Sequence, residues 1–291
     1  DGATGTALQQ FGLTEADFRG EEFAHHPIPL KGNNDVLNIT RPDVIRQVHQ
    51  NYIDAGADII ETNTFNANTI SQTEYGCVEW VSRLNLEGAR LAKETASACK
   101  ERKIYVAGSI GPTDKSLTLA PDPDQPTYRI VNFDTLANAY ASQAAALIEG
   151  GVDLLLVETI YDGLNAKAAL YAIAKVQEEK GTNLPVMLSA TVNDKSGRTL
   201  TGQSLEALFT SLAHYPILSF GLNCSFGAKE LHHFLQELAP RIPCHISIYP
   251  NAGLPNEMGE YDESPEFTAL CLQNMAKEGL INIAGGCCGT T

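Results

Sequence analysis

One local pattern occurs twice in this sequence and limits the folds that the chain can adopt. Residues 51–62 and 146–159 each contain the end of a helix, a glycine, a short apolar run and then the pair Glu-Thr. Residues 275–283 repeat the pattern more loosely. Glycine after a helix supplies a left-handed cap, and short connections from helix to strand are usual in α/β proteins. The chain is therefore expected to alternate helices with buried strands.

The same alternation extends over most of the chain. Apolar runs predict seven strands, near residues 57–62, 104–109, 152–158, 185–192, 217–223, 244–249 and 280–285. Apolar residues at helical spacing predict helices near residues 42–55, 79–101, 133–149, 163–179, 203–213, 228–239 and 264–277. Because the predicted strands are continuous apolar runs, we expect parallel strands that are covered on both faces.

Polar residues follow nearly every predicted strand, and this favours one of two α/β architectures. An open doubly wound sheet binds its ligand near a glycine-rich first turn, but no G-x-G-x-x-G element follows a strand here. A TIM-type (β/α)8 barrel gathers functional groups at the carboxyl ends of all its strands. We therefore expect a single (β/α)8 barrel domain over residues 1–291, part of a longer multidomain chain, lacking most of the first strand before Asp1 and the last helix after Thr291.

The net charge of −15 over 291 residues argues against anionic partners. Nucleic acids and anionic membranes are bound through basic patches. No run approaches the roughly eighteen apolar residues of a membrane helix, and no secretion signal is visible. Seven cysteines form an odd and scattered set, which suits a reducing compartment. We expect a cytoplasmic enzyme that binds neither nucleic acid nor membrane.

Three cysteines follow two of the predicted strands. Cys224 directly follows strand 217–223, and Cys287 and Cys288 follow strand 280–285. Because parallel strands end at the same edge of a sheet, all three thiols are expected to lie together. Three thiolates around one ion make a zinc site with a vacant fourth position, which is typical of catalysis rather than of structural zinc.

Two simpler interpretations of these cysteines remain open. Free cysteine is often buried and only fills core space. Cys287 and Cys288 could instead act as a thiol switch, although a disulfide between adjacent residues is strained. The glycines at positions 285, 286 and 289 favour the metal site, because they permit the sharp turn that aims two adjacent side chains at one point.

The residue types favour one kind of zinc chemistry. Hydrolytic zinc sites normally have His or carboxylate ligands, and the seven histidines form no H-E-x-x-H motif. Three thiolates weaken zinc as an acid for water, but the ion can still hold a fourth thiolate. A thiol with a pKa of ~8.5 is only about 3% ionised at pH 7, so ionisation enforced by the metal increases the nucleophile about thirtyfold. Such a site favours alkyl transfer to sulfur.

The residues at successive strand ends resemble those of the homocysteine S-methyltransferase family. The resemblance covers the whole chain and rests on segments 1–6, 61–65, 109–113, 158–159, 221–224 and 285–289. Further segments resemble the homocysteine-binding module of the cobalamin-dependent members rather than the members that use betaine or S-methylmethionine; they are 31–35, 194–199 and 249–256. Thr4 departs from the pattern, because the family usually has Met there.

The resemblance implies a reaction and its cofactors. Cys224, Cys287 and Cys288 would hold Zn²⁺, with the sulfur of homocysteine as the fourth ligand. The methyl group would come from methylcobalamin carried by another module, with 5-methyltetrahydrofolate as the ultimate donor, and the product would be methionine. The implied partners are therefore homocysteine and the cobalamin-binding and folate-binding modules of the same polypeptide. Betaine or S-methylmethionine as donor remains the alternative.

The resemblance also implies how the substrate is held. Glu158 and Asp1 would receive the ammonium group of homocysteine, and backbone N–H groups around Gly2 and Ala3 would receive its carboxylate. Asn251 would occupy the vacant zinc position when substrate is absent. Two alternatives remain open here: Glu158 could be a structural carboxylate paired with a neighbouring strand, and Asn251 could be a turn former.

Overall fold

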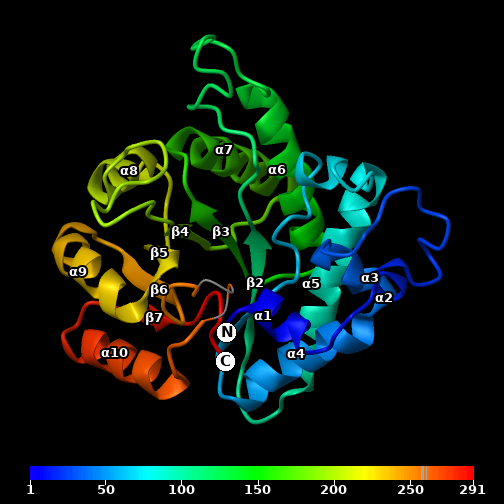
Figure 1. Cartoon of the computed structure of the whole chain (residues 1–291), viewed down its shortest axis with the longest axis horizontal. Helices are drawn as coiled ribbons and strands as arrows, with labels where there is room; N and C mark the ends of the chain where they lie inside the picture. Colours follow the sequence, from blue (N-terminus) through cyan, green and yellow to red (C-terminus); the bar gives the residue numbers. More distant parts are fainter. Residues whose placement is uncertain (257–258, 260) are drawn as a thin grey trace.

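The computed structural model describes residues 1–256, 259 and 261–291. Figure 1 shows a central sheet whose strands are enclosed by helices. All neighbouring strands are parallel, and their order in the sheet is their order in the sequence. The strands are β1 (Ile59–Glu61), β2 (Tyr105–Ile110), β3 (Leu154–Ile160), β4 (Val186–Ala190), β5 (Ser219–Gly227), β6 (His245–Asn251) and β7 (Ile283–Ala284). Each strand thus lies next to the one that follows it in the sequence, and the order never reverses. This is the order of a TIM-type barrel and confirms the α/β barrel class over the doubly wound sheet.

Seven helices alternate with the strands, as predicted. They are α4 (Pro42–Asp54), α5 (Val81–Ala98), α6 (Phe133–Glu149), α7 (Gly163–Lys180), α8 (Leu205–Leu212), α9 (Ala228–Leu238) and α10 (Pro265–Lys277). Their ends follow local chemistry. The carboxylate of Asp162 accepts hydrogen bonds from the first turn of α7, and Gly181 ends the same helix with a φ of 63°.

Short helices before residue 42 were not predicted. They are α1 (Thr4–Gln9), α2 (Glu15–Arg19), the 3-10 turn η1 (Asn34–Val36) and α3 (Leu37–Thr40). Three further 3-10 turns are η2 (Ser71–Thr73), η3 (Val78–Trp80) and η4 (Ala239–Arg241). The N-terminal helices share a second apolar core with α4 and α5, which includes Phe18, Leu30, Leu37, Ile45 and Leu84. Helices this short depend on such packing, because isolated helices of their length are unstable in water.

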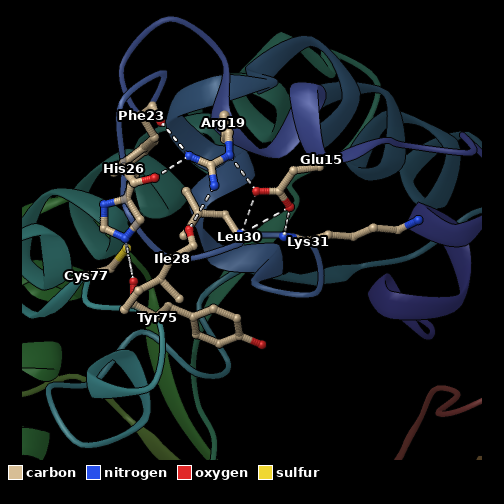
Figure 2. A network of polar contacts seen from close by, with 9 residues as sticks. All are labelled: Glu15, Arg19, Phe23, His26, Ile28, Leu30, Lys31, Tyr75 and Cys77. Carbon is tan, nitrogen blue, oxygen red and sulfur yellow. Dashed lines mark hydrogen bonds and ion pairs between the residues drawn. The ribbon is translucent and has the colours of Figure 1, made fainter.

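Polar contacts tie the segment after α2 to the rest of this layer (Figure 2). The Glu15 carboxylate accepts hydrogen bonds from the backbone N–H of Leu30 and of Lys31, the latter at 2.7 Å. Arg19 pairs with Glu15 and also donates to the backbone carbonyls of His26 and Ile28. These contacts fix the chain immediately before η1, which contributes residues to the site described below.

Two apolar regions pack on opposite faces of the sheet. The larger region lies between the strands and the outer helices and includes Ile60, Leu147, Leu155, Leu188 and Phe220. A smaller region is formed by inward-facing strand residues, namely Ala107, Leu154, Leu156, Met187 and Tyr249. Layers of side chains inside the sheet are typical of a barrel whose interior is packed rather than open.

The edges of the curled sheet, β1 and β7, are linked through Asp1. Its backbone nitrogen donates a hydrogen bond to the carbonyl of Ile59 at 2.9 Å, and its own carbonyl accepts one from the N–H of Gly286 at 3.0 Å. Seven strands of a TIM-type barrel are thus present in the part of the chain that the structure describes, with Asp1 between the first and the last.

Among the helices of the described residues, none combines the length and the apolar character needed to cross a membrane.

Candidate metal centre and substrate cavity

Three sulfur atoms meet at the carboxyl ends of β5 and β7. The Sγ atoms of Cys224 and Cys288 are 4.0 Å apart, those of Cys287 and Cys288 are 3.9 Å apart, and all three lie within 4.8 Å of one another. A tetrahedral zinc site with Zn–S bonds of about 2.3 Å requires sulfurs about 3.8 Å apart. Among the described residues this is the one cluster of three side chains with metal-ligand spacing. The expected meeting of the three cysteines is thus what the structure shows.

A distortion at the end of β5 directs Cys224 towards the other cysteines. The pairing of β5 with β6 shifts register between Asn223 and Gly227, so that the strand bulges there. Cys224 and Ser225 both have positive φ angles, of 63° and 65°. Few residues other than glycine adopt such angles, and strained backbone of this kind is concentrated at functional sites.

The loop after β7 supplies the other two sulfurs and is held by backbone contacts to β6. The N–H of Cys287 donates to the carbonyl of Pro250 at 2.7 Å, and the N–H of Ala252 donates to the carbonyl of Cys288 at 2.9 Å. Gly289 ends the loop with a φ of 78°, and a Cβ there would lie 2.3 Å from the ring of Tyr261. The predicted turn in the glycine-rich segment is therefore present, and it places both adjacent thiols on the same side.

The three sulfurs share negative charge in a way that favours a cation. Hydrogen bonds from Cys287 and Cys288 lower the pKa of Cys224. The same interactions with Cys224 raise the pKa of Cys287 and of Cys288. The cluster therefore ionises readily once, and further thiolates at this spacing require a positive charge between them. A thiophilic divalent cation such as zinc supplies that charge, so the donor set fits the metal.

Two further side chains contact the sulfurs. Asn251, at the end of β6, is buried and hydrogen-bonds to Cys224, which helps to lower the pKa of that thiol. Its Oδ1 atom has no hydrogen-bond partner among the described residues. An unpartnered buried oxygen beside the cysteines suits the predicted role as an occasional metal ligand. Tyr261 hydrogen-bonds to Cys288 and was not predicted, because nothing in its sequence neighbourhood distinguishes it.

The sulfurs open into a cavity of about 290 Å³. Its walls come from the ends of six strands, all but β4, and from the N-terminal segment. Of the predicted site residues, Gly2, Ala3 and Glu158 line it together with the three cysteines. The other lining residues are Thr4, Gly5, Thr6, Asn34, Asp35, Glu61, Thr62, Asn63, Phe65, Asn66, Ser109, Thr159, Asn223, Tyr249 and Gly286. No basic side chain belongs to this lining, so the charged side chains of the described walls are all acidic.

Glu158 faces the cavity from β3, enclosed by protein. The hydroxyl of Ser109 donates a hydrogen bond to Glu158 Oε1 at 2.5 Å. Removal from water raises the pKa of Glu158, and the neighbouring Glu61 carboxylate raises it further. Burial likewise raises the pKa of Glu61. Both carboxyl groups would ionise more readily beside a bound ammonium group.

Asp1 lies beside this cavity but is not part of its lining. Its carboxylate accepts a hydrogen bond from the N–H of Glu61 at 2.7 Å. Glu61, by contrast, lines the cavity directly. Its place in the strand-end segment 61–65 did not by itself predict this. A direct contact between Asp1 and a substrate stays a prediction.

Asp35 is a second cavity residue that was not predicted to belong to the site. It is 3% exposed, and its carboxylate accepts hydrogen bonds from two neutral groups, the N–H of Asn66 and the side-chain amide of Gln72. Burial raises the pKa of Asp35 to about 7. Asp35 belongs to the segment 31–35 that carried the family resemblance. The sequence could not place its side chain in the cavity, because that position depends on the short helices around it.

Known structures agree with this fold, and one family profile matches the sequence. Three crystal structures of the homocysteine methyltransferase MmuM from Escherichia coli, in metallated, oxidized and apo forms, are similar to the chain, with TM-scores of 0.74, 0.76 and 0.68. Their sequence identities are 23%, 23% and 21%, and the match covers 100% of this chain and 91%, 91% and 90% of those chains. The sequence profile described as homocysteine S-methyltransferase matches residues 1–291. The chain therefore belongs to the homocysteine S-methyltransferase family.

Proposed function

We propose that this chain binds one zinc ion through Cys224, Cys287 and Cys288 and methylates the thiol of homocysteine to give methionine. The observation that carries the proposal is the triangle of sulfurs 3.9–4.0 Å apart along two sides, open to a cavity of about 290 Å³. When bound, zinc would supply the Lewis acidity that keeps the homocysteine thiol ionised at neutral pH.

The residues of the chain would hold homocysteine by its amino-acid end as well as by its reacting sulfur. Glu158 and Asp1 would receive the ammonium group, with Glu61 as an additional carboxyl beside them. Backbone N–H groups at Gly2 and Ala3 would receive the carboxylate, since no basic side chain lines the described cavity to do so. Asn251 would fill the open coordination position in the absence of substrate. Such fixed placement is itself a large part of catalysis.

We propose methylcobalamin, carried by another module, as the methyl donor, and 5-methyltetrahydrofolate as its ultimate source. The support is the resemblance of segments 31–35, 194–199 and 249–256 to cobalamin-dependent methionine synthase. The partners would then be the cobalamin-binding and folate-binding modules of the same polypeptide, in the cytoplasm. One observation favours betaine or S-methylmethionine instead, because an acidic cavity without basic side chains also suits a cationic donor.

Metal analysis with a donor assay tests the proposal. The purified chain is expected to contain about one zinc per molecule and to form methionine from homocysteine and free methylcobalamin. Cys224→Ala is expected to lose both the zinc and the activity. A fully active Cys224→Ala variant would refute the metal centre. Activity with betaine or S-methylmethionine but not with methylcobalamin would show that the donor is one of those two compounds.

A further inference from the structure

We propose that Asn223 is the positioning residue that joins the metal centre to the substrate-binding strand. The inference rests on the proposed metal site, since it concerns how Cys224 is held there. Asn223 precedes Cys224 on β5, is 2% exposed, and uses both ends of its amide on neighbouring strands.

The amide of Asn223 makes three hydrogen bonds that connect β5 to β3 and β4. Its Nδ2 donates to the hydroxyl of Thr159 at 2.8 Å, and its Oδ1 accepts from the backbone N–H of Thr159 at 3.0 Å. The same Oδ1 accepts from the hydroxyl of Ser189 at 2.7 Å. Thr159 is therefore held through its main chain and its side chain by one residue of another strand.

The two backbone segments that this amide joins are both in unfavourable conformations. Thr159 has a φ of 55°, and Cys224 and Ser225 have φ angles of 63° and 65°. These are the described residues other than glycine with positive φ. A β-branched residue such as threonine is especially disfavoured there. Because local preference opposes the bends at both strand ends, contacts from outside each segment must maintain them.

The residues next to Thr159 and Asn223 give these hydrogen bonds a functional role. Glu158, the proposed ammonium acceptor, immediately precedes Thr159, and Cys224 immediately follows Asn223. One amide thus fixes the position of the carboxyl group relative to the sulfur. Loss of the amide should therefore weaken metal binding and homocysteine binding together, which a buried amide with a purely structural role would not do.

Asn85 provides a matched control for the loss of a buried amide. It is fully buried in α5, and its Nδ2 donates to the carbonyls of Ala67 and Val81, at 2.6 and 2.8 Å. It does not line the metal cavity. Asn85→Ala should lower the stability of the chain in the same manner as Asn223→Ala, without affecting the cysteines.

The experiment compares the full chain with Asn223→Ala and Asn85→Ala. Zinc affinity is measured by competition with a chromophoric chelator, the geometry of the site by the absorption spectrum of the Co²⁺ form, and stability by thermal unfolding without metal. Asn223→Ala is expected to bind zinc about 10–100-fold more weakly, to change the Co²⁺ spectrum and to raise the KM for homocysteine. Asn85→Ala is expected to keep the affinity and spectrum of the original chain despite a lower unfolding temperature.

Ser189→Ala is a milder variant in case Asn223→Ala does not fold. It removes one of the two donors to Asn223 Oδ1 and should weaken zinc binding about threefold. Unchanged zinc affinity and an unchanged Co²⁺ spectrum in Asn223→Ala, or in Ser189→Ala where only that variant folds, would overturn the inference. If the original chain itself bound no zinc, the proposed metal centre would fail and this inference with it.

Discussion

The Sγ atoms of Cys224 and Cys288 lie 4.0 Å apart, although 64 positions separate the two residues in the chain. Such proximity of thiols predicts a marked effect of metal removal on their reactivity. With zinc bound, three of the seven cysteines should be protected from an aromatic disulfide reagent, and a strong chelator should expose them. Counting the reactive thiols before and after chelation, in a buffer without denaturant, checks this.

Cys99→Ala serves as the control for that titration. Cys99 lies at the end of α5, outside the sulfur cluster, so its replacement should remove one thiol without changing the three released by the chelator. An equal number of reactive thiols with and without chelator would contradict a metal held by Cys224, Cys287 and Cys288.

A second prediction concerns Glu158. The Glu158→Gln variant keeps the shape of the side chain but removes the charge that would pair with the ammonium group of homocysteine. Truncation of one partner of an enclosed ion pair costs about 2 kcal/mol or more, so the KM for homocysteine should rise roughly thirtyfold or more. Steady-state kinetics measure this, with Glu149→Gln on the exposed surface of α6 as the control. Zinc content should be unchanged, and an unaltered KM would exclude Glu158 from substrate binding.

Asp35 should make the apo chain less stable as the pH rises. Its pKa is raised from 3.8 to about 7 in the folded chain, so the folded form binds a proton that the unfolded form has lost between these values. The free energy of unfolding should therefore fall with rising pH, by up to about 1.4 kcal/mol per pH unit from this group. Asp35→Asn should remove that fall, whereas Asp124→Asn in an exposed loop should not. Denaturant unfolding at pH 4–7 provides the measurement.

His49 should act in the opposite direction. It is buried in α4, neither ring nitrogen has a hydrogen-bond partner among the described residues, and burial lowers its pKa from 6.5 to about 4. Its contribution to stability is present above pH 6.5 and is lost as the pH falls towards 4. His49→Leu should therefore remove a loss of stability in acid, with His214→Gln as the exposed control.

The contributions of Asp35 and His49 oppose each other over much of the same pH range. The original chain should consequently show a flatter stability profile than either variant between pH 4 and 6.5. Asp35→Asn should tilt the profile so that stability increases with pH, and His49→Leu should tilt it the other way. Two variants with the same slope as the original chain would show that neither side chain titrates in the folded state as inferred.

The sequence was sufficient to predict the alternating elements and the cysteine cluster. Helix α6 was predicted with the same bounds that the structure has, because its apolar spacing is a local signal. The structure adds the Asn132 cap, whose side chain accepts a hydrogen bond from the N–H of Thr135. The meeting of Cys224 with Cys288 followed from the common direction of parallel strands. These features depend either on neighbouring residues or on the general geometry of one fold class.

The remaining features depend on contacts between distant segments. Helix α1 has six residues and no capping side chain, so no local pattern marks it. The enclosure of Asp35 and Glu61 in the cavity requires packing that composition does not encode. Tyr261 reaches Cys288 from a loop, and the Asn223 amide bonds to a residue 64 positions away. Pairings of this kind become visible only once the strands are placed in three dimensions.

The link between β1 and β7 through Asp1 has a consequence for metal exchange. Gly286, whose N–H bonds to the carbonyl of Asp1, directly precedes Cys287. Loosening of the contacts between β1 and β7 would therefore free Cys287, one of the three proposed zinc ligands, before the other two. The dissociation rate of zinc should then follow the rate at which these contacts open. The residence time of the metal would therefore report local opening of the sheet.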